Sequence, residues 1–328
     1  MEIPGSLPGV LIEEIGGQHG VMEEHVDFLK TYFTLITLKE FLDKKEQLAE
    51  KIQSVFVWGT KPVVTHDILQ SLPYLKVVVS SGAGIDHLDL KMISSFGVKI
   101  ANTPNAVTSA TADLAMTLLL VSARNFLEGC KIAVSPHTQC FHLSWTSEEV
   151  TGATVGIIGM GRIGYKIAQR AKAFEMKVLY HNRTRRLEYE SSLGATYCER
   201  MADLLQQSDF VILAVTLTQE THKLIGKNEL QQMKSSATLI NISRGAVVDQ
   251  DALVDALQHG YIRAAALDVT FPEPLPRDHP LLKMENVILT PHIGSATRNS
   301  RRIMMENMVQ SMLDAINDLP VSNEVLVN

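Results

Sequence analysis

The chain has 328 residues, of which 45% are hydrophobic and 20% charged, and its formal net charge at pH 7 is −6. The length predicts two domains, and the composition is typical of a globular protein that buries a large core. The negative balance argues against a protein that binds the nucleic-acid backbone.

Cysteine usage and the chain ends bear on the compartment. Cys130, Cys140 and Cys198 follow no disulfide or metal-site spacing, which is typical of a reducing compartment, and we predict no metal site. Residues 1–5 lack the basic segment of a secretion signal, and residues 326–328 are not the peroxisomal Ser-Lys-Leu. No apolar run approaches the length of a membrane helix. We therefore expect a cytoplasmic protein.

Short apolar runs alternate with helical patterns along most of the chain, which is typical of α/β units built on parallel sheets. In the first third we predict helices at residues 21–29, 39–52 and 88–96. The strands predicted in the same third lie at residues 9–12, 34–37, 55–58, 77–80 and 98–101.

Two long apolar helical stretches, residues 108–123 and 297–318, flank a second set of strands. These strands are predicted at residues 154–158, 177–180, 210–215, 238–242, 264–269 and 287–289. We interpret the two long stretches as connections between two domains. The second stretch, residues 297–318, returns the chain to the first domain. The predicted fold class is α/β, with two Rossmann-like or flavodoxin-like parallel-sheet domains, residues 1–106 plus 299–328 and residues 107–298. The active site would lie in the cleft between them.

The first strand of the second set runs directly into Gly159, Gly161 and Gly164, in the pattern Gly-x-Gly-x-x-Gly, and then into a helical pattern. In such a turn the first glycine permits a sharp bend, the second lets the backbone approach a pyrophosphate, and the third allows close helix–strand packing. The phosphates would bind the N–H groups at the helix N-terminus. A glycine-rich turn can be merely structural, but its place between strand and helix favours dinucleotide binding.

The strand predicted next ends where an acidic residue would hold the 2′-hydroxyl of NAD. The sequence there has no carboxylate and instead carries Asn182, Arg183 and Thr184, followed by Arg185 and Arg186. An acid would repel a 2′-phosphate, whereas guanidinium groups bind one through charge-assisted hydrogen bonds. A solvated basic loop is the alternative, but the position favours NADP(H) over NAD(H).

Three residues that could do chemistry each follow a buried-looking strand: Arg244, Glu273 and His292. Ligands gather beyond the carboxyl ends of strands in open α/β sheets, so these side chains are candidates for an active site. Singly, each has a structural alternative: the histidine can be a satisfied structural residue, the arginine a cap, and the glutamate a surface turn residue. Their common position, in the domain with the glycine loop, favours an active site.

Four ordered motifs together resemble the D-isomer-specific 2-hydroxyacid dehydrogenases. They are the glycine loop, residues 241–245 (Asn-Ile-Ser-Arg-Gly), residues 267–274, and residues 290–297 (Thr-Pro-His-Ile-Gly-Ser-Ala-Thr). Residues 80–89 look like the substrate loop of that family. Within the family, residues 182–184 and 268–276 look closest to the glyoxylate/hydroxypyruvate reductases.

The resemblance implies an NADPH-dependent enzyme that reduces glyoxylate or hydroxypyruvate to glycolate or D-glycerate by hydride transfer. His292 would donate a proton to the carbonyl oxygen, while Glu273 would bind the other ring nitrogen and favour the charged ring. Arg244 would clamp the substrate carboxylate through its planar fork. The backbone N–H groups of Ala83 and Gly84 would bind the remaining carboxylate oxygen.

The resemblance also implies the other contacts. The discontinuous domain would bind the substrate, and the continuous domain would bind NADP(H). Further substrate contacts would come from Asp268, Ser295 and Trp145, with Asp268 also beside the nicotinamide ring. Besides the glycine loop and residues 182–184, the cofactor would touch Thr108, Met160, Arg162, Ile163, Arg186, Thr216, Ile242 and Gly294.

The chain departs from the family at one segment. In glyoxylate/hydroxypyruvate reductases a tryptophan after the connecting helix looks across the dimer interface into the neighbouring substrate site. Here residues 129–137 have no tryptophan, and Trp145 is the candidate. By analogy we expect a homodimer whose interface is formed by residues 108–123 and the segment that follows.

Two alternatives stay open. The first is another D-2-hydroxyacid dehydrogenase linked to NAD, such as a phosphoglycerate or formate dehydrogenase. The second is a dinucleotide-sensing binding protein like the corepressors of this superfamily, which keep the same three catalytic residue types. Asp86 and Asp89 near Ala83 offer no basic residues for the phosphorylated substrate of the first, and the basic loop at residues 182–186 weighs against the second.

Overall fold

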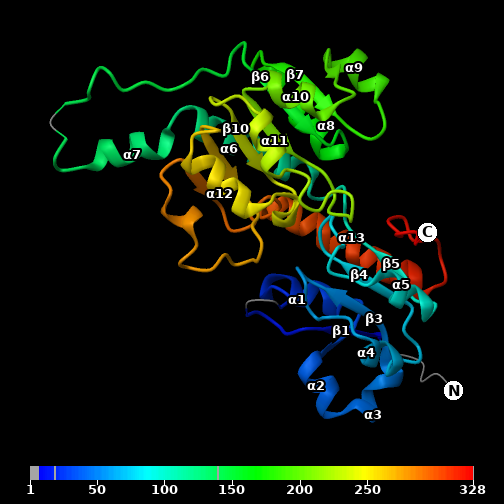
Figure 1. The fold of residues 1–328 in the computed structure, drawn as a ribbon. Helices are drawn as coiled ribbons and strands as arrows, with labels where there is room; N and C mark the ends of the chain where they lie inside the picture. The colour runs from blue at the N-terminus through cyan, green and yellow to red at the C-terminus, as the bar shows by residue number, and fades with distance from the viewer. Residues whose placement is uncertain (1–6, 18–19, 139, 328) are drawn as a thin grey trace. The chain divides into compact units, whose positions relative to one another are not determined.

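The structure, a computed structural model, describes residues 7–17, 20–138 and 140–327. It divides into two compact units: unit 1 comprises the residues up to Val107 and from Thr297 onward, and unit 2 comprises Thr108–Ala296 (Figure 1). The boundaries expected from the sequence lie within two residues of these divisions. Residues 1–5 and Asn328, on which the expectations about the chain ends rest, lie outside the described residues.

Unit 1 is built on a five-stranded sheet in the order β2-β1-β3-β4-β5, in which every pair of neighbours is parallel. This is a flavodoxin-like strand order. The strands are β1 Gly9–Ile12, β2 Thr34–Thr37, β3 Ile52–Val57, β4 Val77–Ser80 and β5 Lys99–Ala101.

Helices cover both faces of this sheet. Alternate side chains of its strands point to opposite faces, and each face packs with helices in its own hydrophobic cluster. One face packs against α1 and α13, and the other against α2, α4 and α5. The helices of unit 1 are α1 Glu23–Lys30, α2 Leu38–Asp43, α3 Lys45–Leu48, the 3₁₀ turn η1 Ala49–Lys51, α4 His66–Gln70, α5 Leu90–Ser95 and α13 Arg298–Ile316.

The single helix predicted at residues 39–52 is wrong. Lys44, with φ −131° and ψ 39°, interrupts it after α2, and α3 and η1 are short separate turns. Ile52, which fits the helical spacing, instead opens β3 and is fully buried beside Gly9 of β1. A short apolar run at a helix–strand junction fits both periods, so the pattern alone does not locate the boundary.

Unit 2 has a seven-stranded sheet in the order β12-β11-β10-β9-β6-β7-β8, again parallel throughout. Chain order reverses between β6 and β9, as in a Rossmann fold, and ligands of such sheets bind beyond the strand ends at that point. The strands are β6 Thr154–Ile158, β7 Lys177–His181, β8 Thr196–Tyr197, β9 Phe210–Leu213, β10 Thr238–Asn241, β11 Ala264–Leu267 and β12 Val287–Leu289.

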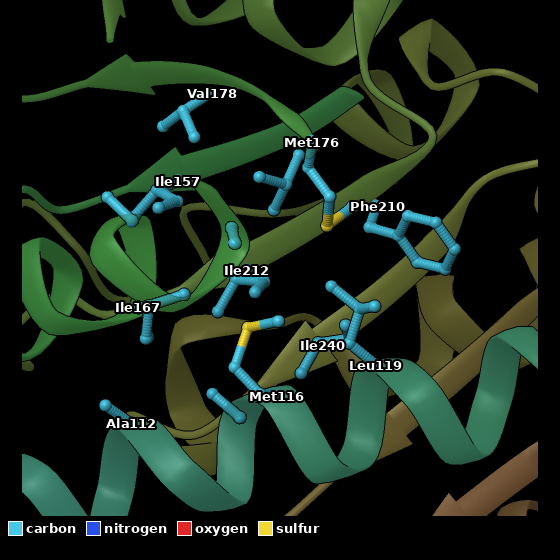
Figure 2. Packing of buried hydrophobic residues seen from close by; sticks show 14 of the residues in the cluster. Ala112, Met116, Leu119, Ile157, Ile167, Met176, Val178, Phe210, Ile212 and Ile240 are labelled. Atoms are coloured by element: carbon cyan, nitrogen blue, oxygen red, sulfur yellow. The ribbon is translucent and has the colours of Figure 1, made fainter. Parts of the chain in front are cut away.

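Two hydrophobic clusters again sandwich the sheet. Figure 2 shows Met116 and Leu119 of α6 pointing toward Ile212 and Ile240 of the sheet. On this face lie α6 and α8, and on the other α10, α11 and α12. The helices of unit 2 are α6 Thr108–Ala123, α7 Phe126–Val134, α8 Arg162–Ala173, α9 Leu187–Leu193, α10 Met201–Gln207, α11 Lys227–Gln232, η2 Gly245–Val247, α12 Gln250–Gln258 and η3 Pro280–Lys283.

Three strands of unit 2 end earlier than predicted. β9 ends at Leu213, β10 at Asn241 and β11 at Leu267, although the apolar runs continue beyond them. Ile242 and Val269 remain buried after leaving the sheet. A residue can be buried, and therefore apolar, after its strand has ended and its hydrogen bonds to neighbouring strands have stopped. Hydrophobicity alone therefore overestimates strand length.

Helix α7 is absent from the sequence-based prediction. We define the arm as α7 and the residues that follow it, 126–138 and 140–149. No residue of α7 is buried, and in Figure 1 the arm projects from the sheet of unit 2. Apolar side chains nevertheless lie on it, including Val134 and Leu143 with exposed fractions of 82% and 97%. Within the described residues, no helix is both long and apolar enough to span a membrane.

We predict that Gly164→Ala destabilises unit 2 whereas Gly161→Ala does not. A Cβ at Gly164 would overlap the Gly159 carbonyl oxygen and lie 3.3 Å from a side-chain carbon of Ile157, whereas a Cβ at Gly161 would meet nothing within 4 Å. Overpacking of this kind costs about 1–3 kcal/mol, and a neutral surface change less than about 0.5 kcal/mol. Urea denaturation followed by circular dichroism measures both, and equal midpoints for the two variants would contradict the packing argument.

Candidate active site

The glycine loop joins β6 to α8. Gly159 has φ 102°, a conformation that side chains rarely adopt, and its N–H donates to the His181 carbonyl at 2.9 Å. Gly161 precedes α8 and gives it no side-chain cap, so the first N–H groups of that helix have no capping side chain. Open space lies where a Cβ of Gly161 would be. An uncapped helix start with room beside it fits a pyrophosphate group.

Asn182 ties this loop to the end of β7. Its Oδ1 accepts from the Met160 N–H at 3.1 Å, and its Nδ2 donates to the Thr184 carbonyl at 2.7 Å. The Asn182 side chain therefore shapes both the glycine loop and the basic loop. Its predicted contact with the cofactor, like that of Thr184, stays a prediction.

The three arginines of the basic loop have different environments. Arg185 makes two hydrogen bonds of 2.8 Å to Glu190, and together with the Tyr180 hydroxyl it lowers the pKa of that carboxyl to about 2. Arg185 is thus engaged within the fold. Arg183 is exposed, and Nε of Arg186 is buried with no hydrogen-bond partner among the described residues. Arg183 and Arg186 are the arginines that fit a bound 2′-phosphate.

Burial raises the pKa of Tyr180 to about 12, so its hydroxyl stays protonated. That hydroxyl donates to Glu190 and accepts the Arg186 N–H, both at 2.8 Å. The base of the basic loop is therefore fixed by a buried network, while its outer part remains exposed.

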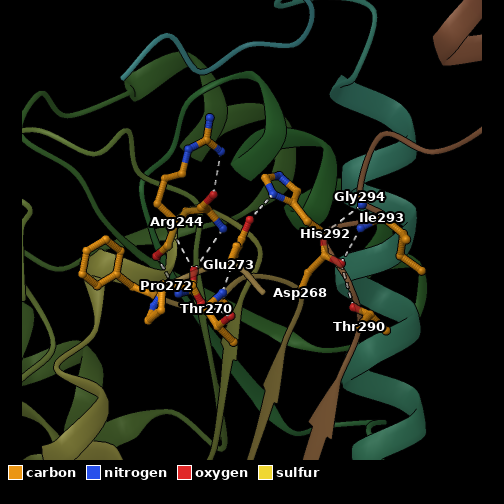
Figure 3. A network of polar contacts seen from close by, with 12 residues as sticks. Arg244, Asp268, Thr270, Pro272, Glu273, Thr290, His292, Ile293 and Gly294 are labelled. Atoms are coloured by element: carbon orange, nitrogen blue, oxygen red, sulfur yellow. Dashed lines mark hydrogen bonds and ion pairs between the residues drawn. The ribbon is translucent and has the colours of Figure 1, made fainter. Parts of the chain in front are cut away.

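The three predicted catalytic side chains follow three neighbouring strands. Arg244 comes after β10, Glu273 after β11 and His292 after β12. Because these strands are parallel and adjacent in the sheet, their carboxyl ends lie along one edge. The structure brings Glu273 and His292 into direct contact (Figure 3).

Nδ1 of His292 and Oε2 of Glu273 are 2.9 Å apart. The other carboxylate oxygen of Glu273 accepts the Thr270 N–H at 3.0 Å. Burial alone would raise the pKa of Glu273, but the hydrogen bond and charge of His292, the Thr270 N–H and the charge of Arg244 outweigh it and lower that pKa. The carboxyl of Glu273 therefore stays ionised at neutral pH beside the ring.

His292 is held in a left-handed conformation, with φ 55°. A residue other than glycine there costs about 1 kcal/mol or more, so the surroundings must impose it. Asp268, which is 98% buried, accepts hydrogen bonds from the Thr290 hydroxyl and from the N–H groups of Ile293 and Gly294, all within 2.9 Å. Its carboxylate thus fixes the turn that carries His292. The predicted contacts of Asp268 with substrate and nicotinamide stay predictions.

Arg244 is half-buried in the segment between β10 and η2. Its Nη1 donates to the Ser243 carbonyl at 2.9 Å, and its own carbonyl accepts from the Asn241 side chain at 2.8 Å. Its positive charge also contributes to the low pKa of Glu273. The arginine therefore lies close enough to the pair to act with it electrostatically.

A cavity of about 480 Å³ opens beside the pair, lined in part by His292 and Glu273. The sequence-based prediction did not include Thr270, Arg277 and Leu282, which also line it. The signal that could have pointed to them is their place between β11 and β12, in the same segment as Glu273.

Ala83 and Gly84 lie in unit 1, in the loop after β4. Asn102 donates to the Ala83 carbonyl at 2.8 Å, and Thr103 accepts the Gly82 N–H at 2.8 Å, so this loop is well anchored. The predicted role of the Ala83 and Gly84 N–H groups stays a prediction.

Other predicted ligand contacts belong to unit 2. Thr108 opens α6, Ile242 is buried, and the Thr216 carbonyl accepts the Thr221 hydroxyl at 2.6 Å. Ser295 is half-buried beside Gly294. Their predicted contacts with cofactor and substrate stay predictions.

Trp145 belongs to the arm and lies against its own chain. Its ring is 5.4 Å from that of Phe141, and a Cβ at Gly129 of α7 would be 3.9 Å from it. Its Nε1 is buried and has no hydrogen-bond partner within the described residues. Its predicted contact with a substrate stays a prediction.

Comparison with known proteins supports the family that the sequence motifs suggest. The profile of the family described as D-isomer specific 2-hydroxyacid dehydrogenase, NAD binding domain, matches residues 116–294. Glyoxylate reductase of Pyrococcus horikoshii is 41% identical over 82% of this chain and 82% of its own length. Glyoxylate/hydroxypyruvate reductase B of an Enterobacter species is 40% identical over 88% of this chain and 90% of its own.

Among solved structures, the NADPH-dependent glyoxylate/hydroxypyruvate reductase of Sinorhizobium meliloti, in complex with NADP and malonate, is similar to this chain. The two share 29% identity and a TM-score of 0.84, over 98% of this chain and 97% of the other. The glycine loop, the doubly wound parallel sheets and these relatives together show that the chain belongs to the D-isomer-specific 2-hydroxyacid dehydrogenases, which are NAD(P)-dependent oxidoreductases.

Proposed function

We propose that this protein is a reductase of small 2-keto acids that uses NADPH to convert glyoxylate to glycolate and hydroxypyruvate to D-glycerate. The observation that carries the proposal is the His292–Glu273 hydrogen bond at the strand ends, with Arg244 close enough to act on it. The relatives named as glyoxylate or glyoxylate/hydroxypyruvate reductases support the choice of substrates.

His292 supplies the proton in this proposal. The carboxylate of Glu273 binds Nδ1 and fixes the orientation of the ring. Nε2–H then donates to the carbonyl oxygen of the keto acid as negative charge develops there. When bound, the reduced nicotinamide supplies the hydride to the carbonyl carbon.

Arg244 binds the substrate carboxylate. A guanidinium offers parallel N–H donors that match the two oxygens of a carboxylate, and its positive charge polarises the neighbouring carbonyl. The ionised Glu273 keeps the local charge balanced when the substrate anion is absent. A 2-keto acid, with adjacent carboxylate and carbonyl, matches this pair of functions.

The cofactor preference is assigned to the basic loop. The absence of an acidic residue at 182–186 removes the repulsion that a 2′-phosphate would meet. Exposed Arg183 and the unpartnered Nε of Arg186, taken among the described residues, are the proposed donors. The glycine loop and the start of α8 are proposed to hold the pyrophosphate.

We also propose that two copies associate through the arm. Helix α6 uses its apolar side chains in the core of unit 2, so it has few left for a partner. The arm exposes Phe126, Val134, Phe141 and Leu143, more apolar surface than an isolated chain element usually leaves in water. A second copy of this chain would cover it.

Changing His292 to Ala is predicted to lower kcat for glyoxylate reduction by roughly 10²- to 10⁴-fold, because the general acid is lost. Glu273→Gln replaces the charged partner of Nδ1 by a neutral amide, so the ring is held less firmly and kcat should fall as well. Fluorescence titration with NADPH should give unchanged affinity in both variants. Full turnover by His292→Ala would contradict the assignment of the acid.

Changing Arg183 to Ala should raise the KM for NADPH far more than the KM for NADH, because only NADPH carries the 2′-phosphate. Arg200→Ala is the matched control, since Arg200 is 76% exposed, pairs with Asp203 and is not one of residues 182–186. Steady-state kinetics with both cofactors measures the effect. Equal changes in both KM values would remove the argument for a phosphate site.

Changing Leu143 to Asp should dissociate the proposed dimer. Leu143 is exposed in the single chain, and the partner copy would bury it, so a charge there would be costly to bury. Leu187→Asp, at an exposed leucine of α9 outside the arm, is the control. Sedimentation velocity measures the oligomeric state. A wild-type monomer, or a Leu143→Asp variant that sediments as the wild type does, would contradict this interface.

A further inference from the structure

We propose that Gln250 is a positioning residue for the His292–Glu273 pair, because its side-chain amide fixes the loop that carries Glu273. The inference rests on the proposed function, in which that pair donates the proton. Gln250 is the first residue of α12. Its Oε1 accepts the Phe271 N–H at 2.8 Å, and its Nε2 donates to the carbonyl of the same residue.

The double contact is informative because of where it falls. An amide side chain that binds both the N–H and the C=O of one residue replaces the partner that a neighbouring strand would supply. β11 has already ended at Leu267, so the following loop has no ladder bonds of its own. Gln250 ties this loop to a helix that packs in the core.

Side-chain packing anchors the loop at buried Val269 and Leu275 but not at Phe271. The Phe271 side chain is 63% exposed, so little apolar burial holds the residue in place. The contacts from the Thr270 N–H to Glu273 and from the Thr270 hydroxyl to the Pro272 carbonyl stay within the loop. They shape it but do not fix its place relative to the sheet.

A second contact comes from the same segment as Gln250. Gly245 lies so close to Thr270 and Phe271 that a Cβ on it would overlap the Thr270 carbonyl carbon and oxygen. The loop is therefore held between Gly245 and Gln250, which both follow Arg244 in the chain. One short segment thus sets the proposed carboxylate clamp and the support of the proposed acid relative to each other.

A shift of the loop would act on His292 through Glu273. Hydrogen bonds weaken steeply once distance or angle departs from ideal, and the bond between Nδ1 and Oε2 is 2.9 Å long. Glu273 is two residues from Phe271, so freeing Phe271 lets the carboxylate move. The ring of His292 then loses part of the contact that orients it.

The main test is Gln250→Leu, which keeps the approximate side-chain size and removes both hydrogen bonds. A displacement of about 1 Å in a reacting group can cost about 100-fold in rate. We expect kcat for glyoxylate reduction to fall by up to that order, with a smaller change in KM. Gln250→Glu keeps an acceptor for the Phe271 N–H, so its kcat should lie between those of the wild type and Gln250→Leu.

Gln258→Leu is the matched control. It makes the same substitution on the last residue of α12, where the side chain is exposed, and should behave as the wild type. Should Gln250→Leu not fold, as judged by circular dichroism, Gln250→Glu carries the same test. An unchanged kcat in the folded Gln250 variant would overturn the proposal.

A readout that needs no turnover separates this proposal from the proposed function. In protein with ¹⁵N-labelled histidine, the Nδ1–H of His292 should give a downfield proton signal, assigned by its loss in His292→Ala. We expect the signal to weaken or move upfield in Gln250→Leu and to stay in Gln258→Leu. A signal unaffected by Gln250→Leu overturns the positioning role. A Gln250-dependent signal in a protein that reduces no keto acid overturns the function instead.

Discussion

The carboxyl ends of β10, β11 and β12 lie side by side in one parallel sheet, and the candidate chemistry depends on that arrangement. Parallel pairing places consecutive strand ends at the same edge, so residues far apart in sequence meet without long side chains. Glu273 and His292 meet there at 2.9 Å. Helices on both faces bury the strands, which makes this edge a rigid base for the loops that follow.

The loops at this edge are held by polar contacts in addition to the packing of side chains such as Val269 and Leu275. Buried Asp268 gathers three donors and imposes the left-handed conformation of His292. Hydrogen bonds of Thr270 and Gln250 hold the loop that carries Glu273. A residue in a disfavoured conformation persists only where its surroundings over-determine it, and such residues concentrate at functional sites. The candidate acid is therefore positioned by its neighbours, with the charge of Glu273 beside it.

Most strands, and the places of Arg244, Glu273 and His292 just after strands, could be predicted from the sequence, because apolar runs, glycine spacing and strand-end polar residues are local signals. Contacts between distant segments could not. The pairing of Asp268 with the 290–294 turn and of Gln250 with Phe271 joins residues more than 20 positions apart. Helix α7 was missed because its apolar residues face outward, so no buried face marks it. The basic loop was recognised as a whole, but only the contact with Glu190 distinguishes Arg185 from its neighbours.

The most direct test of the central claim follows the hydride itself. The purified protein is incubated with NADPH that carries deuterium at both positions of C4 of the nicotinamide and with glyoxylate or hydroxypyruvate, and the products are analysed by mass spectrometry and NMR. The proposed hydride transfer predicts glycolate or glycerate with one deuterium at C2, together with oxidised NADP. Cofactor oxidation without deuterium at C2, or no product with either keto acid, would contradict it.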